Sequence, residues 1–492
     1  MTLRRYKLYK DSGVEWLGAV PAHWDVAAVG YRYEVLLGKM LDEKRITGNH
    51  LAPYLRNIDV QWDRINVEDL PQMDFSGDDL DRYRVAPGDL LVCEGGEVGR
   101  AAIWRGELPE CYYQKAIHRL RRRSETADHP RFMFYVLRMA TAIGVFEASE
   151  GKSTIAHLTA EALRRYRFGF PPRREQECIA AFLDREVVQI DTLIAEQQRL
   201  IELLTEKRQA VIAQAVTTGL NPSMPMKDSG VEWLGAVPAH WDVVRLKFIA
   251  HVQTGIAKGK DNSGKLTTEV PYLRVANVQD GYLDLDDVST IELPADDLPR
   301  YRLQAGDVLM NEGGDFDKLG RGHVWDGSID PCIHQNHVFA VRPFAVSPRW
   351  LNAVTGSAYA QFYFMSRSKQ STNLASISST NIMELPVVIP PADEQEALLD
   401  WLDAQSTAFD RLIEDAGNAV RLLRERRTAL VSAAVTGQID VRDRSSLDTA
   451  LAETCAEIAA GRCVVESAAA HVARLQAMTS ADKQSAPPPA PC

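Results

Sequence analysis

The chain has 492 residues, of which 45% are apolar and 25% charged, and its formal net charge at pH 7 is −11. This composition is ordinary for a globular protein, and a chain of this length is expected to form two to four domains. It contains no run of eighteen apolar residues, so no membrane span is predicted, and its basic N-terminus lacks the apolar core of a secretory signal. The seven scattered cysteines include no CxxC pair, which argues against a zinc site and indicates unpaired thiols in a reducing cytoplasm.

A duplicated block is the most informative feature of the sequence. Residues Lys10–Val26 read KDSGVEWLGAVPAHWDV, and the same seventeen residues return as Lys227–Val243 at an offset of 217. Shorter matches follow at Tyr54-Leu55-Arg56 with Tyr272-Leu273-Arg274 and at Glu94-Gly95-Gly96 with Glu312-Gly313-Gly314. The chain is therefore predicted to be a tandem repeat of one unit of roughly 215 residues. Wide divergence between the matches indicates one scaffold with two different recognition surfaces, and drift after duplication is the alternative.

Each repeat begins with a globular part, residues 27–170 and 244–389. Short apolar runs broken by Gly, Pro, Asn and Asp predict strands, for example at Asp89–Cys93 and at Leu385–Ile389. Helices are expected around residues 130–146 and 347–365. Mixed strands with a few helices predict an α+β fold for both globular parts.

A long helix is predicted after each globular part. No Pro or Gly occurs from Arg174 to Val216, and Gly219 follows as a stop signal; the second copy shows the same spacing of apolar residues and ends at Gly437. The apolar positions recur as an a/d heptad seam. The predicted seam residues are Val187, Ile190, Ile194, Ile201, Leu204, Arg208 and Val211 in the first helix, and Leu402, Phe409, Ile413, Val420, Leu423, Arg427 and Leu430 in the second.

The two seams superpose at an offset of 219, including the polar interruptions Arg208 and Arg427. A helix of this length cannot bury its apolar stripe alone, and its own repeat is the nearest partner. Equal units that pair through equivalent surfaces tend to be related by a two-fold axis, so the helices are expected to form an antiparallel coiled coil. Arg208 and Arg427 are expected to set the register through an acid or a backbone acceptor, and docking of a partner is the alternative.

The predicted organisation is a pseudo-two-fold tandem repeat of two α+β domains joined by two long helices. The predicted segments are 1–26 (N-terminal repeat segment), 27–170 (first globular domain), 171–219 (first helix), 220–243 (linker with repeat segment), 244–389 (second globular domain), 390–441 (second helix) and 442–492 (an Ala/Pro-rich tail, partly helical, with a disordered end). Two inverted domains would match the local two-fold symmetry of a DNA duplex.

The distribution of charge is more informative than its sum. Residues 112–138 carry seven basic and two acidic side chains, and residues 245–265 carry five basic and one acidic. A basic run in each variable half favours phosphate contacts over the alternative of ordinary solvated faces.

The search for catalytic motifs indicates a non-catalytic chain. The Pro-Pro pairs lack the neighbours of a methyltransferase loop. Gly259–Lys265 approaches a phosphate-binding loop, but Leu266 replaces the hydroxyl that would bind the metal, so a flexible loop touching phosphates is expected instead. His334 and His337 lie close together without a cysteine or carboxylate at ligand spacing, and no metal site is predicted.

In this combination of motifs the chain resembles the specificity subunit of type I restriction–modification systems. The resemblance spans about residues 9–441 and is carried by the twin repeat blocks and two further pairs of motifs. These are GDLLVCEGGEVGR (88–100) with GDVLMNEGGDFDKLGR (306–321), and PPRREQECIAAFLDREVVQID (171–191) with PPADEQEALLDWLDAQSTAFD (390–410).

The resemblance implies two target-recognition domains, each reading one half of a split DNA sequence, with the coiled coil as spacer. It also implies two methyltransferase (modification) subunits docked on that spacer and restriction/translocase subunits joined through them. S-adenosylmethionine, ATP and Mg would belong to those partners, and this cytoplasmic chain would hold no cofactor. The alternative function is a coiled-coil scaffold that assembles partners without reading DNA.

Candidate DNA-binding residues are polar side chains of the types that read base edges or phosphates. In the first domain they are Lys39, Arg45, Asn49, Arg56, Asn57, Gln114, Lys115, Lys152, Ser153 and Thr154. In the second they are Lys258, Lys260, Asn262, Lys265, Arg274, Asn277, His334, Gln335, Asn336, Lys369, Gln370 and Asn373. Because Arg56 recurs as Arg274, this pair is expected to support the scaffold or a phosphate rather than to read a base.

Overall fold

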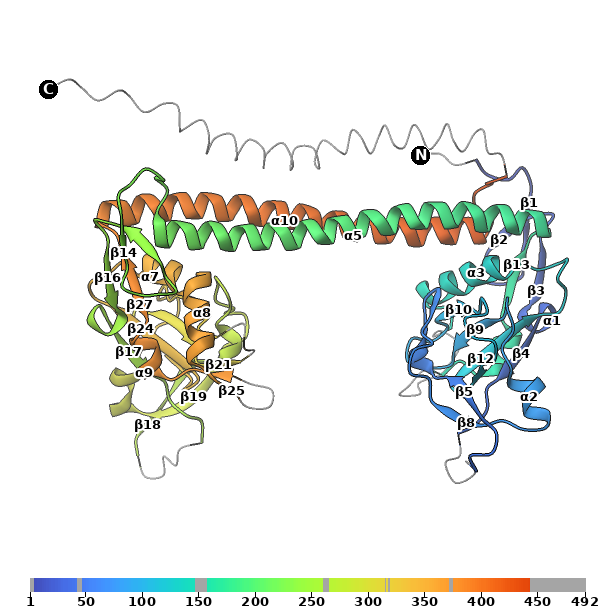
Figure 1. Cartoon of the computed structure of the whole chain (residues 1–492), viewed down its shortest axis with the longest axis horizontal. Helices are drawn as coiled ribbons and strands as arrows, with labels where there is room; N and C mark the ends of the chain where they lie inside the picture. The colour runs from blue at the N-terminus through green and yellow to red at the C-terminus, as the bar shows by residue number, and fades with distance from the viewer. Residues whose placement is uncertain are drawn as a thin grey trace, which may run out of the picture. The chain divides into compact units, whose positions relative to one another are not determined.

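The computed structural model (Figure 1) describes residues 4–41, 47–146, 157–259, 265–314, 316, 319–370 and 375–442. Two compact units are present: unit 1 combines the chain up to Gln197 with the chain from Asn418 onward, and unit 2 is Gln198–Gly417. Both boundaries fall inside the two long helices, α5 (Arg173–Thr218) and α10 (Ala392–Val435). Each unit therefore contains one globular domain, the beginning of the helix that follows it and the end of the other helix.

The domain of unit 1 is built on a four-stranded antiparallel sheet of order β10-β9-β12-β4 (Ala101–Ile103, Leu90–Cys93, Ile117–Arg122, Tyr33–Leu37). A second sheet has the order β11-β5-β8 (Tyr112–Tyr113, Leu51–Leu55, Gln72–Asp74), in which β11 and β5 are parallel. The domain also contains three separate strand pairs: β13–β3 (Arg167–Phe170, Asp25–Ala28), β1–β2 (Tyr9–Asp11, Ala19–Pro21) and β6–β7 (Val60–Gln61, Arg64–Ile65). The helices are α1 (Val29–Arg32), η2 (Asn57–Asp59), α2 (Asp78–Tyr83), α3 (Pro130–Ala142) and α4 (Ala160–Arg165).

The domain of unit 2 repeats this topology. Its sheets have the orders β22-β20-β24-β17 (Gly322–Val324, Val308–Asn311, Val338–Pro343, Ala250–Thr254) and β23-β18-β19 (Ile333–His334, Thr267–Leu273, Ser289–Pro294). The strand pairs are β27–β16 (Pro386–Ile389, Asp242–Arg245) and β14–β15 (Met226–Asp228, Ala236–Pro238), and a small sheet β21-β26-β25 (Gly313–Gly314, Ala375–Ser376, Lys369–Gln370) is added. The helices are η3 (Leu246–Phe248), η4 (Val275–Asn277), η5 (Ala295–Asp297), α6 (Leu298–Tyr301), α7 (Pro348–Thr355), α8 (Ala358–Arg367) and α9 (Ser379–Met383).

One expected helix is divided in two. The segment predicted around residues 347–365 forms α7 and α8 with a break at Gly356 and Ser357. The Ser357 hydroxyl accepts a hydrogen bond from the backbone N–H of Ala360 and so caps α8, which is why the chain restarts there. In unit 1 the corresponding α3 begins with Pro130 at a position where a helix tolerates proline, and it buries most of its residues.

The ends of the long helices belong to the domain cores. In unit 1, Leu183 of α5 and Val435 of α10 share one core cluster with Trp24. In unit 2, Val216 of α5 and Leu399 of α10 share another with Trp241 and Trp350. In each unit the beginning of one helix thus packs beside the end of the other. The predicted antiparallel pairing of the two helices and the α+β class are confirmed.

The seam residues are buried to different degrees. Val187, Ile190, Ile194, Leu204, Leu402, Phe409 and Val420 are buried, and Ile201, Arg208, Val211, Ile413, Leu423, Arg427 and Leu430 are half-buried. Arg208 forms an ion pair with Asp410 in unit 2, with an Nη1–Oδ1 distance of 2.9 Å, and Arg427 pairs with Asp191 in unit 1. Asp191 and Asp410 are themselves related by the offset of 219, so each unit contains the same pair. Within the described residues, no helix is long and apolar enough to cross a membrane.

Candidate nucleic-acid interface

The identical block anchors each domain to the start of a long helix. In unit 1, Trp24 Nε1 donates to Glu175 of α5 at 2.9 Å and His23 Nε2 lies 2.8 Å from the same carboxylate. In unit 2, Trp241 and His240 contact Glu394 of α10 at 3.0 and 2.7 Å. Tyr6 adds a third contact to Glu175, at 2.6 Å. The His-Trp pair of the identical block thus makes the same contact with a helix-borne glutamate in both units.

A second shared contact orients the strand that ends each domain. The side-chain amide of Gln176 donates to the carbonyl of Pro171 at 2.8 Å, and Gln395 donates to Pro390 at the same distance. Both glutamines are buried, so the Pro-Pro-x-x-Glu-Gln motif joins the last strand of each domain to its helix. These contacts position the domains without facing a ligand.

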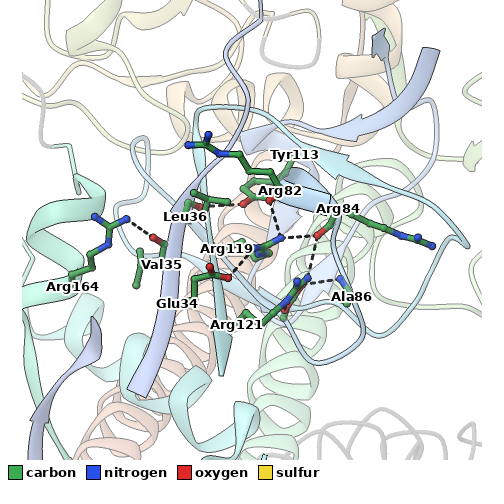
Figure 2. Close-up of polar contacts among 11 residues, drawn as sticks. Glu34, Val35, Leu36, Arg82, Arg84, Ala86, Tyr113, Arg119, Arg121 and Arg164 are labelled. Carbon is green, nitrogen blue, oxygen red and sulfur yellow. Dashed lines mark hydrogen bonds and ion pairs between the residues drawn. The ribbon is translucent and has the colours of Figure 1, made fainter. Parts of the chain in front are cut away.

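Much of the basic run in residues 112–138 is used inside the fold. Figure 2 shows the buried guanidinium of Arg119, which donates to the carbonyls of Arg82 (3.0 Å) and Arg84 (2.8 Å) and to Glu34 (3.1 Å). The guanidinium of Arg121 donates two hydrogen bonds to the carboxylate of Asp89, at 2.8 and 2.6 Å. The Asp89 contact is repeated in unit 2 by Arg342 and Asp307, at 2.6 and 2.7 Å.

Arg131 is used in the same way, since it pairs with Asp184 at 2.6 Å and with Asp63 at 2.5 Å. Arg119, Arg121 and Arg131 are therefore structural, and residues 112–138 do not form one continuous phosphate-binding face. Strand β12 turns alternate arginines toward internal acceptors, which a count of charges along the sequence does not reveal.

In unit 1 several candidate residues meet at one edge of the small sheet. Arg56 follows β5 and Gln114 follows β11, and because these strands are parallel both residues leave the sheet at the same edge. Lys39 forms a bridge with Gln114, and the Lys115 N–H donates to the Lys39 carbonyl at 2.8 Å. The structure thus brings Lys39, Arg56, Asn57, Gln114 and Lys115 together.

These residues differ in their freedom to contact a ligand. Arg56 is held by Asp59 at 2.8 and 2.9 Å, and Asn57 donates to Gly95 and accepts from Arg100. Lys39 is paired with Asp79 at 2.7 Å. Lys115 is exposed and Gln114 half-buried, so these two present their side chains most directly at this edge.

Asn49 is exposed on a neighbouring loop whose geometry depends on Asp74. That carboxylate accepts hydrogen bonds from the backbone of Thr47, Gly48 and His50 and from the Thr47 hydroxyl. These contacts, the His50 N–H foremost, lower the pKa of Asp74 to about 2. Sequence analysis missed Asp74, because a lone aspartate at the end of a strand carries no signal of its distant partners.

The equivalent edge in unit 2 follows the parallel strands β18 and β23. Gln335 and Asn336 follow β23 and are half-buried, and Arg274, which follows β18, pairs with Asp287 at 2.9 Å. Lys258, Lys265, Lys369 and Gln370 are exposed.

Two candidates of unit 2 are core residues. His334 is fully buried and its Nδ1 donates to the Val338 carbonyl at 2.7 Å, while burial lowers its pKa to about 4 and keeps the ring neutral. Asn277 is buried and its amide donates to the carbonyls of Asp284 and Asp287, both at 2.9 Å. Neither side chain reaches a surface where a base or phosphate could meet it, so the assignment of these two residues to DNA contact is corrected.

The remaining candidates lie outside the described residues. They are Arg45, Lys152, Ser153, Thr154, Lys260, Asn262 and Asn373. Within the described residues, no group of three or more His, Cys, Asp or Glu side chains is arranged to hold a metal ion.

Comparison with known proteins agrees with this architecture. Residues 38–204 match the family described as type I restriction modification DNA specificity domain. The specificity subunit of the type I restriction enzyme EcoKI from Escherichia coli K12 is 22% identical over 87% of this chain and 92% of its own length. That of the type I restriction enzyme MjaVIII from Methanocaldococcus jannaschii is 24% identical over 86% of this chain and 95% of its own.

A solved structure shares the fold. It concerns the structural basis underlying complex assembly and conformational transition of the type I R-M system, and one of its chains matches with a TM-score of 0.64 at 15% identity, over 85% of this chain and 98% of that chain. The fold is thus that of a duplicated α+β protein with two long helices. Together with the sequence matches, it confirms that the chain resembles the specificity subunits of type I restriction–modification systems, as its motifs predict.

Proposed function

We propose that this chain is the non-catalytic DNA-sequence-recognition subunit of a type I restriction–modification complex, in which each globular domain reads one half of a bipartite DNA target. The observation that carries the proposal is the contrast between a shared scaffold and divergent edges. The His-Trp pair contacts Glu175 and Glu394 in the same way, and an arginine contacts Asp89 and Asp307 in the same way. Among the residues that leave the parallel strand pairs, Gln114 and Gln335 are the same, whereas Lys115 corresponds to Asn336 and Asn57 to Val275.

Side chains at these edges are the proposed DNA contacts. Asn49, Gln114 and Lys115 in unit 1 are exposed or half-buried, as are Gln335 and Asn336 in unit 2. Amide side chains can read base edges, and lysines neutralise phosphates. We propose that Lys258, Lys265, Lys369 and Gln370 add contacts in unit 2, and that Arg56 and Arg274 support the edges from within.

The two long helices are the proposed spacer and docking surface. Two methyltransferase subunits would bind there, and restriction/translocase subunits would join through them. S-adenosylmethionine, ATP and Mg would be bound by those partners in the cytoplasm, and methylation or cleavage would be their chemistry.

An exchange of domains tests the reading function. Residues 27–170 are replaced by the corresponding segment of a relative, and the methylated sequence is mapped in cells that also produce the partner subunits. We expect one half of the target to change and the other half to stay. The matched exchange of residues 244–389 should change the opposite half. A change in both halves, or in neither, would contradict the proposal.

The scaffold alternative makes a different prediction. If the chain only assembled partners, the methyltransferase subunits would bind the same DNA sequence with and without it. Competition binding with specific and scrambled duplexes at a fixed salt concentration separates the two functions, because non-specific binding depends steeply on salt.

A further inference from the structure

Unit 1 contains a cavity of about 250 Å³ that the proposed DNA-reading function does not use. It lies where α3 meets the last turns of α10. Its lining residues are Trp62, Glu97, Arg138, Met139, Thr141, Ala142, Arg427, Thr428 and Val431. Two arginines from different helices, Arg138 of α3 and Arg427 of α10, therefore line one space.

The charges around the cavity are only partly compensated. Arg427 is paired with Asp191, and Glu97 accepts from Trp62 Nε1 at 2.6 Å and faces Arg100 at 3.7 Å. Within the part of the chain that the structure describes, Arg138 has no hydrogen-bond or ion-pair partner. Burial and then the neighbouring charge of Arg427 lower the pKa of Arg138, and the negative charge of Asp191 opposes this shift in part. A half-buried cation loses hydration, and a second cation beside it repels it. An anion placed between the two arginines would reduce both of these costs.

The cavity is not part of the duplicated scaffold. At the offset of 218 that relates Pro130 to Pro348, Arg138 corresponds to Gly356 in unit 2, and Trp62 corresponds to Asp280. Arg427 has its counterpart in Arg208, which pairs with Asp410. The second arginine and the aromatic wall are therefore specific to unit 1, and the pairing of the long helices does not require them.

We propose that this cavity binds a phosphate group, either free or carried by a nucleotide. Each guanidinium group recognises phosphate through a planar fork of N–H donors. Two guanidinium groups match the two negative charges of a phosphate better than they match the single charge of a carboxylate. Trp62 offers an aromatic surface at the wall, which a nucleotide base could contact. Because Arg138 belongs to the domain and Arg427 to α10, a bound phosphate would bridge the two and stiffen their junction. The proposal is independent of DNA reading.

Calorimetric titration of the full chain at low ionic strength tests the site, with inorganic phosphate, ADP and adenosine as probes and no DNA present. We expect one phosphate site per chain and at least a tenfold weaker affinity in Arg138→Gln. Arg138→Lys should bind with intermediate affinity. Arg165→Gln is the matched control, because this exposed arginine on α4 pairs with Glu161 away from the cavity, and its affinity should equal that of the unchanged chain.

The probes identify the source of the phosphate. Equal affinities for inorganic phosphate and ADP would support recognition of the group alone, and tighter binding of ADP would support a nucleotide. Binding of adenosine with the same affinity as ADP would overturn the phosphate assignment. So would the absence of saturation in the unchanged chain up to about 10 mM phosphate, or unchanged affinity in Arg138→Gln.

A second measurement covers the case in which Arg138→Gln fails to fold. Hydrogen exchange of the unchanged chain is compared with and without inorganic phosphate. We expect slower exchange in residues 130–142 and 420–435, and no change in residues 348–355 of unit 2. Equal protection of both units would indicate general anion binding and would overturn the proposal.

Discussion

At the residue scale, one glutamate on each long helix holds the neighbouring domain. Glu175 accepts hydrogen bonds from Trp24 and Tyr6 and contacts His23. Glu394 contacts Trp241 and His240, and no counterpart of Tyr6 contacts it within the described residues. Glu175 is also more deeply buried than Glu394. The same motif is thus reinforced in unit 1 by a tyrosine from the N-terminal segment.

Replacement of these glutamates by alanine should destabilise the two units unequally. Glu175→Ala leaves two buried donors without an acceptor, and we expect a loss of about 3–5 kcal/mol in unit 1. Glu394→Ala should cost about 1.5–3 kcal/mol in unit 2, because its site is more open. Hydrogen exchange followed by mass spectrometry measures the local free energy of each unit. Equal losses, or a loss in the opposite unit, would contradict this assignment.

Two buried histidines should make the protein sensitive to acid. Burial lowers the pKa of His118 and of His334 to about 4. The His118 Nε2 donates to Leu158, and neither ring has a hydrogen-bond partner for its second nitrogen within the described residues. Because the unfolded pKa of about 6.5 lies above the folded one, the stabilising contribution is complete above pH 6.5 and is lost as the pH falls toward 4.

We therefore expect each histidine to account for a loss of about 2 kcal/mol between pH 7 and pH 5. Urea unfolding at the two pH values measures this loss. His118→Gln should reduce the loss in unit 1, since glutamine can still donate to Leu158 and does not titrate. His50→Gln is the control, because His50 is exposed. An unchanged loss in His118→Gln would show that other groups cause the acid sensitivity.

At the scale of elements, the long helices were the most predictable feature. A heptad pattern is local, so both helices and their seams could be read from the sequence. The expectation that Arg208 and Arg427 need an acid agrees with their ion pairs to Asp410 and Asp191. The same offset relates the two acids, and this repeated pairing is the signal by which the sequence could have identified them.

These pairs should contribute to the register of the helices. The carboxylates are 58% and 42% exposed, so we expect a coupling energy of only about 0.5–1 kcal/mol for each pair. A double-mutant cycle with Arg208→Ala and Asp410→Ala, read by thermal unfolding, measures that energy. The charge exchange Arg208→Asp with Asp410→Arg should restore most of the stability lost in either single variant. Additive losses without recovery would assign the arginines to partner docking.

The candidate site was less predictable than the helices, because the role of a polar residue depends on contacts distant in sequence. In the sequence, His334 and Arg119 cannot be distinguished from exposed residues that bind DNA, yet both are buried in the fold. Asp74 carries no sequence signal, although it orders the loop that contains Asn49. The parallel pairs β5–β11 and β18–β23 explain why Gln114 and Gln335 reach an edge, and this pairing is not evident from local patterns.

At the scale of the whole molecule, duplication would let one chain carry the two specificities of the proposed function. Each unit has its own core and its own helix ends, so that mutations at one edge need not disturb the other unit. The His-Trp pair of the identical block attaches both domains to a helix by the same contact. The residues proposed to read DNA are thus separate from the attachment contacts, as the proposed function requires.

Lengthening both helices tests the proposed spacer. Seven residues inserted after Glu196 and seven after Asp415 add one heptad to each helix, which preserves the seam and adds about 10 Å of helix. If the helices set the spacing, the preferred gap between the half-targets should grow by about three base pairs, since each adds 3.4 Å. The half-targets themselves should stay the same. Methylation should also slow, because three base pairs rotate one half-target by about 100° around the duplex axis. Maps of methylated sites in cells that produce the lengthened chain measure both effects.

A matched insertion of seven residues into α5 alone breaks the pairing and should abolish methylation. An unchanged gap with both insertions would show that the helices do not set the distance between the half-targets.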